Sequence, residues 1–272
     1  MSRLVEAIKK AQIGTPGPKH RPAREKFSAQ ENLTIPHPEH ESGDSGVFRT
    51  LAHHVVPVDS SYLHERRVIA ASNQDDRVGP YRQLRTQLLK TMQENHWQTL
   101  AITSAHVGAG KTLTSSNLAI AMSRDINTTV LLVDLDLETP TMHQVLNLKP
   151  EKGLVDYLED RAELGEILFN PGLERLAVLA GRSAGRNASE LLTTPRMQHL
   201  IHDLCHQDAS NITIFDLPPL LRNDDAVMFA PFADATLVVV EEGVTTEDQL
   251  RETMRLLEKA NVIGTILNKA RT

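Results

Sequence analysis

The chain has 272 residues, of which 40% are hydrophobic, 4% aromatic and 24% charged, and its formal net charge is -6. This composition suffices for one substantial α/β core with an additional segment. The acidic balance argues against a protein that coats nucleic acid, and the single cysteine, Cys205, excludes a disulfide framework. No apolar run has the length of a membrane span and no signal peptide is evident, so we expect a cytoplasmic protein that reaches a membrane only through a partner.

The first part of the chain is rich in proline, histidine and charged residues and shows little sustained apolar periodicity. Such a composition cannot bury enough apolar surface to offset the entropy of ordering the chain. Its histidines are irregularly spaced and lack cysteine partners, which favours a solvated linker over a metal site. We therefore predict a flexible N-terminal arm over residues 1–78 and a folded domain over residues 79–272.

From Tyr81 onward, apolar strands alternate with helical segments, a pattern typical of βαβ units and a parallel sheet. The predicted strands are Leu100–Thr103, Val130–Asp134, Leu176–Leu179, Ile212–Asp216, Thr236–Val240 and Val262–Leu267. The predicted helices are Tyr81–Glu94, Lys111–Arg124, Pro195–His206 and Thr246–Ala260. We expect a three-layer α/β fold of the P-loop NTPase class, with a mainly parallel sheet flanked by helices and the ligand at the carboxyl ends of the strands.

A glycine-containing loop follows the first predicted strand and reads A-H-V-G-A-G-K-T from Ala105 to Thr112. Gly108 and Gly110 let the backbone turn tightly enough for successive N–H groups to face phosphate oxygens, Lys111 adds positive charge, and the hydroxyl of Thr112 can bind Mg²⁺. The pattern predicts a site for a nucleoside triphosphate, with ATP and Mg²⁺ as the ligands. The residues predicted to bind the nucleotide here are Val107, Gly108, Ala109, Gly110, Lys111, Thr112 and Leu113.

Aspartates end two further apolar strands, and a P-loop enzyme needs acids to hold magnesium and to position the attacking group. We predict Asp216 as the Walker B acid that acts on Mg²⁺ directly or through water. Asp134 is the candidate general base or second acid beside the metal, and Asp136 is its companion. A single aspartate at a strand end is commonly a turn or helix cap, but the P-loop followed by two such strand ends, in this order, favours the catalytic interpretation.

With these motifs in place, residues 79–269 resemble the cytoplasmic domain of bacterial tyrosine kinases of exopolysaccharide and capsule synthesis. That family is of the CpsD/CapB type, within the MinD/ParA-type P-loop ATPases. The resemblance rests on the P-loop and on the segments Y-R-Q-L-R-T, L-L-V-D-L-D-L, G-L-V-D-Y-L, S-E-L-L, F-D-L-P-P and I-L-N. It implies that Asn268 contacts adenine and that Asp134 helps to activate the tyrosine hydroxyl that attacks the γ-phosphate.

The chain also departs from the family pattern. His106 occupies the position of the lysine that MinD/ParA relatives carry early in the P-loop, which favours the kinase branch. Gly79 replaces the glutamate of the family's ring contact, although Arg82 and Arg85 can still reach a common acidic partner in a homo-oligomer, or form a solvated basic face. The last tyrosine is Tyr157, so we expect no tyrosine-rich C-terminal tail as phosphate acceptor.

Two functions follow as hypotheses. The first is a Mg-ATP-dependent protein-tyrosine kinase that regulates exopolysaccharide or capsule synthesis beside a membrane-spanning chain-length adaptor, at the inner face of the membrane. The second is an ATP-operated switch or scaffold that hydrolyses ATP without phosphorylating tyrosine.

Overall fold

The structure is a computed structural model that describes residues 55–72, 75–184, 188–205 and 210–270. Its centre is a seven-stranded sheet in the order β3-β4-β2-β5-β1-β6-β7. β3 runs antiparallel to β4, and the other neighbours are parallel. The strands are β1 (Thr99–Ser104), β2 (Thr129–Asp134), β3 (Leu168–Phe169), β4 (Leu176–Leu179), β5 (Asn211–Asp216), β6 (Ala235–Glu241) and β7 (Val262–Asn268).

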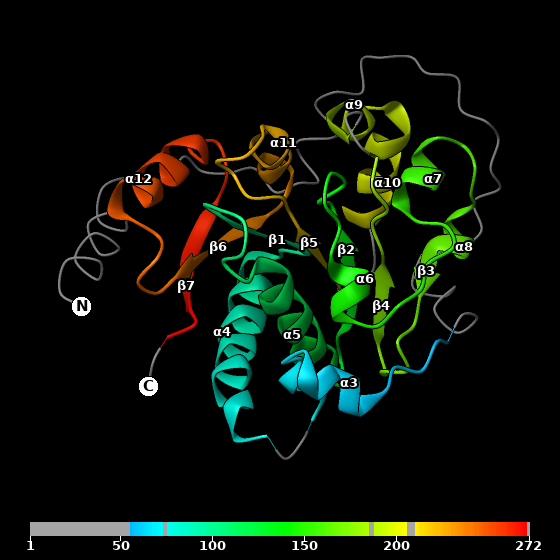
Figure 1. The fold of residues 1–272 in the computed structure, drawn as a ribbon, viewed down its shortest axis with the longest axis horizontal. Helices are drawn as coiled ribbons and strands as arrows, with labels where there is room; N and C mark the ends of the chain where they lie inside the picture. The colour runs from blue at the N-terminus through cyan, green and yellow to red at the C-terminus, as the bar shows by residue number, and fades with distance from the viewer. Residues whose placement is uncertain (1–54, 73–74, 185–187, 206–209, 271–272) are drawn as a thin grey trace.

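Helices cover both faces of the sheet, with α4 and α5 side by side on one of them (Figure 1). The helices are α3 (Ser60–Glu65), α4 (Gly79–Asn95), α5 (Lys111–Ser123), α6 (Met142–Val145), α7 (Leu154–Leu158), α8 (Leu164–Ile167), α9 (Ala188–Leu192), α10 (Pro195–Cys205), α11 (Asp225–Phe229) and α12 (Glu247–Leu256). Short 3-10 turns are η2 (Ile69–Ala71), η3 (Asp76–Val78) and η5 (Ala230–Phe232). In the part of the chain that the structure describes, no helix is both long and apolar enough to cross a bilayer.

The central strands are buried on both faces because successive side chains point to opposite sides of a sheet. In β2, Leu131 and Val133 pack into the core formed with α7 and α9–α12. Val130 and Leu132 pack into the core formed with α3–α6. This is the predicted three-layer α/β fold, and the bounds of all six predicted strands lie within one residue of those observed.

The segment before α4 belongs in part to the packed structure, although the sequence placed it in the flexible arm. Val55 forms a bridge with Asn170, and Leu63 and Val68 are buried against the α5 side of the sheet. The N–H of Ala70 donates a 2.9 Å hydrogen bond to Oδ1 of Asn117 in α5. Residues 55–72 therefore contact the folded domain, through scattered apolar side chains and backbone groups that sequence periodicity cannot reveal. Residues 1–54 and 73–74 of the predicted arm lie outside the described residues, and the division between the two units stays a prediction.

Candidate functional site

The phosphate-loop sequence lies between β1 and α5, as predicted. Gly108 and Gly110 have φ angles of +84° and +92°, a region that side chains with a Cβ rarely occupy. Val107 is 62% exposed at the tip of the loop, and Ala109 is fully buried beneath it. Among the described residues, no N–H of residues 107–110 donates a hydrogen bond of standard geometry to another backbone group. The loop therefore presents backbone donors at a helix N-terminus, the arrangement that binds phosphate.

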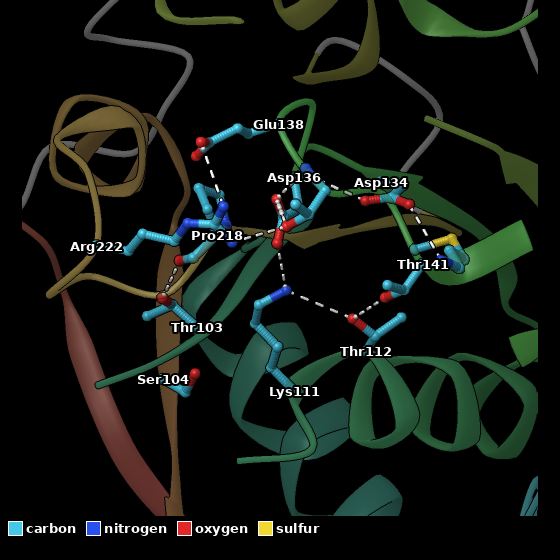
Figure 2. Close-up of polar contacts among 12 residues, drawn as sticks. Thr103, Ser104, Lys111, Thr112, Asp134, Asp136, Glu138, Thr141, Pro218 and Arg222 are labelled. Atoms are coloured by element: carbon cyan, nitrogen blue, oxygen red, sulfur yellow. Dashed lines mark hydrogen bonds and ion pairs between the residues drawn. The ribbon is translucent and has the colours of Figure 1, made fainter. Parts of the chain in front are cut away.

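Lys111, the first residue of α5, points toward the acids at the ends of the strands (Figure 2). Its Nζ lies 2.9 Å from Oδ2 of Asp136 and 3.5 Å from the hydroxyl of Thr112. Burial alone would lower the pKa of Lys111, but the carboxylates of Asp216 and Asp136 reverse the effect, and its pKa is raised. Lys111 is thus a permanent cation beside the P-loop.

Asp134 and Asp216 end neighbouring parallel strands, where they pair in register. Both are fully buried, and burial raises the pKa of each carboxyl. The charge of Asp216 raises the pKa of Asp134 further. Oδ1 of Asp134 accepts the N–H of Asp136 and Oδ2 accepts that of Met142, each at 3.2 Å. Asp134 is therefore a carboxyl held in a fixed orientation by the loop that follows its own strand.

Asp216 has a different environment. Its two oxygens are buried and form no hydrogen bond of standard geometry, although the hydroxyls of Thr112 and Ser115 lie close enough to favour its ionised form. A buried carboxylate with unmatched acceptors beside a hydroxyl suits Mg²⁺, which prefers oxygen ligands and completes its shell with water and phosphate oxygens. Thr112 and Asp216 therefore fit a magnesium nucleotide.

Asp136 is held by Thr139, a residue that the sequence reasoning missed. Oδ1 of Asp136 accepts both the N–H and the hydroxyl of Thr139, each at 3.0 Å. Arg222, which follows β5, donates a 3.1 Å hydrogen bond to the same hydroxyl and pairs with Glu138 at 3.2 Å. The hydroxyl of Thr141 donates to that of Thr112 at 3.2 Å. The hydroxyl-rich segment T-P-T, from Thr139 to Thr141, could have indicated that side chains near Asp136 and Thr112 are held by hydrogen bonds.

The remaining predicted site residues lie around the loop. Leu113 is half-buried in the first turn of α5. Asn268, at the end of β7, donates from Nδ2 to the carbonyl of Ala109 at 2.9 Å. Its contact with adenine stays a prediction. Oδ1 and the second hydrogen of Nδ2 are the parts of the Asn268 amide that could form that contact. Arg85 donates to the carbonyl of Ala121 at 3.3 Å, so part of its guanidinium group already has a partner within the chain. The oligomer contact through Arg82 and Arg85 stays a prediction.

Comparisons with known proteins agree with this geometry. Residues 100–272 match the CobQ/CobB/MinD/ParA nucleotide binding domain family. The chain is 30% identical over 190 residues to tyrosine-protein kinase YwqD of Bacillus subtilis (strain 168), a match that covers 69% of this chain and 79% of YwqD. It is 33% identical over 196 residues to tyrosine-protein kinase etk of Escherichia coli (strain K12), which covers 71% of this chain and 27% of etk.

The chain therefore spans about a quarter of the length of etk. The solved kinase domain of Escherichia coli ETK is similar in fold, with a TM-score of 0.69 and 31% identity over 80% of this chain and 89% of that domain. The matches and the P-loop confirm a nucleotide-binding domain and the predicted family. The chain belongs to the bacterial tyrosine-kinase branch of the CobQ/CobB/MinD/ParA nucleotide-binding family.

Proposed function

We propose that this chain transfers the γ-phosphoryl group of Mg-ATP to a tyrosine hydroxyl and thereby regulates the synthesis or export of an exopolysaccharide or capsule. The observation that carries the proposal is the buried cluster of Lys111 of the P-loop with two strand-end carboxyls and the carboxyl of Asp136, which follows β2. Asp134 and Asp216 are in register on adjacent strands, and Asp136 pairs with Lys111. The membership of the tyrosine-kinase branch supplies the reaction type.

Each group has a role that its surroundings support. The loop N–H groups and Lys111 would stabilise charge on the transferring phosphoryl group. Thr112 and Asp216 would hold Mg²⁺, which neutralises charge on the phosphates. Asp134 would accept the proton of the tyrosine hydroxyl in its ionised form, which the charge of a bound Mg²⁺ would favour against the effect of burial. Asp136 would position Lys111.

The acceptor is a tyrosine of a partner protein in this proposal. The sequence contains three tyrosines, and each of them is engaged in the packed structure. The hydroxyl of Tyr62 donates to the carbonyl of Gln144 at 2.8 Å, Tyr81 has its pKa raised by burial, and the ring of Tyr157 lies 4.2 Å from the guanidinium carbon of Arg196. We further propose, from the family resemblance, that the partner is a membrane-spanning chain-length adaptor, which would place this chain at the inner face of the membrane.

The test is incubation of the purified chain with Mg-ATP, with and without the cytoplasmic segment of the adaptor. Phosphotyrosine is mapped by mass spectrometry while phosphate release is followed. We expect phosphotyrosine on the adaptor segment and its loss in Lys111→Met. Phosphate release without phosphotyrosine in either protein would overturn the kinase proposal.

That second outcome would support the rival function, an ATP-operated switch or scaffold with slow hydrolysis. The small number of tyrosines in the sequence, three, favours this rival. A nucleotide-dependent change in adaptor binding, measured with Mg-ATP and Mg-ADP, would then be the activity to follow.

A further inference from the structure

Side chains hold the outer side of the phosphate loop. Four consecutive carbonyls, those of residues 106–109, each accept a hydrogen bond from a side chain. The bonds run from Ser104 Oγ to His106 O (2.9 Å), from His106 Nδ1 to Val107 O (3.0 Å), from Lys269 Nζ to Gly108 O (2.8 Å) and from Asn268 Nδ2 to Ala109 O (2.9 Å). In a planar trans peptide the carbonyl and the following N–H point in opposite directions. Fixing these carbonyls therefore fixes the N–H groups of residues 107–110 on the other side, where a bound phosphate would accept them.

Lys269 is held in place by an ion pair. Its Nζ pairs with Oε1 of Glu241 at 2.8 Å, and the Glu241 side chain is only 14% exposed. Glu241 and Asn268 are register partners at the ends of β6 and β7, and the N–H of Glu242 donates to the carbonyl of Asn268 at 3.0 Å. The ammonium group thus links the carbonyl of Gly108 to two adjacent strand ends.

His106 is held from the same side. Its Nε2 lies 2.9 Å from the hydroxyl of Thr245, and that oxygen also accepts the N–H of Glu241 at 2.9 Å. All three contacts are satisfied when the Thr245 hydroxyl donates to Nε2 and Nδ1 carries the hydrogen that reaches Val107 O. His106, which stands where MinD/ParA relatives carry a lysine, therefore joins the phosphate loop to the turn between β6 and α12.

We propose that His106, Lys269 and Glu241 are positioning residues that preset the phosphate loop by holding its carbonyls outward. They act through the backbone N–H groups and not by contact with the nucleotide. This inference rests on nucleotide binding at the P-loop and not on the transfer to tyrosine, so failure of the kinase assay leaves it intact.

The test measures the affinity of the full chain for Mg-ADP and for adenosine, with urea unfolding of each variant alongside. In Lys269→Met we expect the Kd for Mg-ADP to rise about three- to tenfold, because loosened donors weaken charge-assisted hydrogen bonds. The affinity for adenosine, which has no phosphate, should stay unchanged. Lys259→Met, which removes an exposed lysine just after α12, is the matched control and should bind both ligands as the wild type does.

The charge of Lys269 could attract the nucleotide without any positioning, and Glu241→Ala separates the two explanations. Removing a negative charge near the site should tighten Mg-ADP binding if only long-range electrostatics acts. If Glu241 instead positions Lys269, loss of their ion pair should weaken Mg-ADP binding. His106→Ala changes the side chain that holds Val107 O and should weaken Mg-ADP binding in the same direction, which keeps the test open if Glu241→Ala does not fold. Tighter or unchanged Mg-ADP binding in both variants, or equal losses for Mg-ADP and adenosine, would overturn the proposal.

Discussion

Nζ of Lys111 lies 2.9 Å from Oδ2 of Asp136, and the two side chains are 10% and 6% exposed. Removing one partner of such a pair leaves a buried charge without its counterion, which costs more than the pair itself contributes. The pair also sets the position of the ammonium group before any nucleotide arrives. Its energetics can therefore be measured in the protein alone.

We expect Asp136→Asn to lower the free energy of unfolding by about 1–3 kcal/mol, since it weakens the contact with Lys111 and with Thr139. Lys111→Met should cost a similar amount, because three carboxyls then face one another without the cation. The double variant should lose less than the sum of the two, with a coupling of about 1–3 kcal/mol in urea unfolding. Strict additivity would show that the contact contributes nothing to stability.

Asp134 predicts a specific pH dependence of stability. Burial, with the charge of Asp216, raises its pKa from 3.8 to about 8. Between these values the folded state binds more protons at this carboxyl than the unfolded state, so the free energy of unfolding falls as the pH rises through this window. Asp134→Asn removes that titration. The wild type should therefore lose stability relative to Asp134→Asn as the pH rises from about 5 to about 8.

Urea unfolding at several pH values checks this expectation. Asp248→Asn is the control, since the Asp248 side chain is 91% exposed, and its difference from the wild type should not change across the same range. Parallel curves for Asp134→Asn and the wild type would contradict the raised pKa.

Gly110 and Gly108 form a matched pair for testing the contact between the loop and β7. Both have positive φ angles, but a Cβ on Gly110 would meet Nδ2 of Asn268 at 2.1 Å, whereas a Cβ on Gly108 has no neighbour within 4 Å. Gly108→Ala should cost about 1 kcal/mol from backbone strain alone. Gly110→Ala should cost about 1 kcal/mol more, because Asn268 must give up its bond to Ala109. Chemical denaturation measures both.

The double variant Gly110→Ala, Asn268→Ala completes this comparison. Once the Asn268 amide is gone, the new methyl group has room, so the extra cost of Gly110→Ala should disappear. Persistence of the full cost would mean that backbone strain, and not the contact with Asn268, determines the need for glycine.

The sequence predicted the parallel strands well because strands buried on both faces read as continuous apolar runs, as in Leu131–Val133. β3 was missed because its two residues are too few to show any period and it joins the edge antiparallel. The P-loop and the strand-end aspartates could be found from local patterns. The pairing of Lys111 with Asp136 rather than Asp134 could not, because it depends on how the loop after β2 folds back. The same holds for Lys269, which reaches the P-loop across 161 positions of sequence.

Asn117 tests how residues 55–72 are attached to the domain. In α5 its Oδ1 accepts the N–H of Ala70 at 2.9 Å, and its Nδ2 donates to the carbonyl of Arg67 at 3.1 Å. Asn117→Ala leaves the buried N–H of Ala70 without a partner, which costs about 1–3 kcal/mol. Undocking of the segment avoids that cost, so we expect local opening to become more frequent. Trypsin cleavage after Arg66 and Arg67, followed by mass spectrometry under native conditions, should become about tenfold faster or more.

The control is Asn95→Ala, which removes an exposed side-chain hydrogen bond to Thr91 within α4 and should leave cleavage after Arg66 and Arg67 unchanged. Because α5 also carries Lys111 at its first turn, opening that is confined to the segment should leave Mg-ADP affinity close to that of the wild type. A fall in global stability with no faster cleavage would contradict local opening. In that case the buried side chains of Leu63 and Val68 would hold the segment to the core even without the hydrogen bonds of Asn117, and residues 55–72 would unfold only together with the sheet.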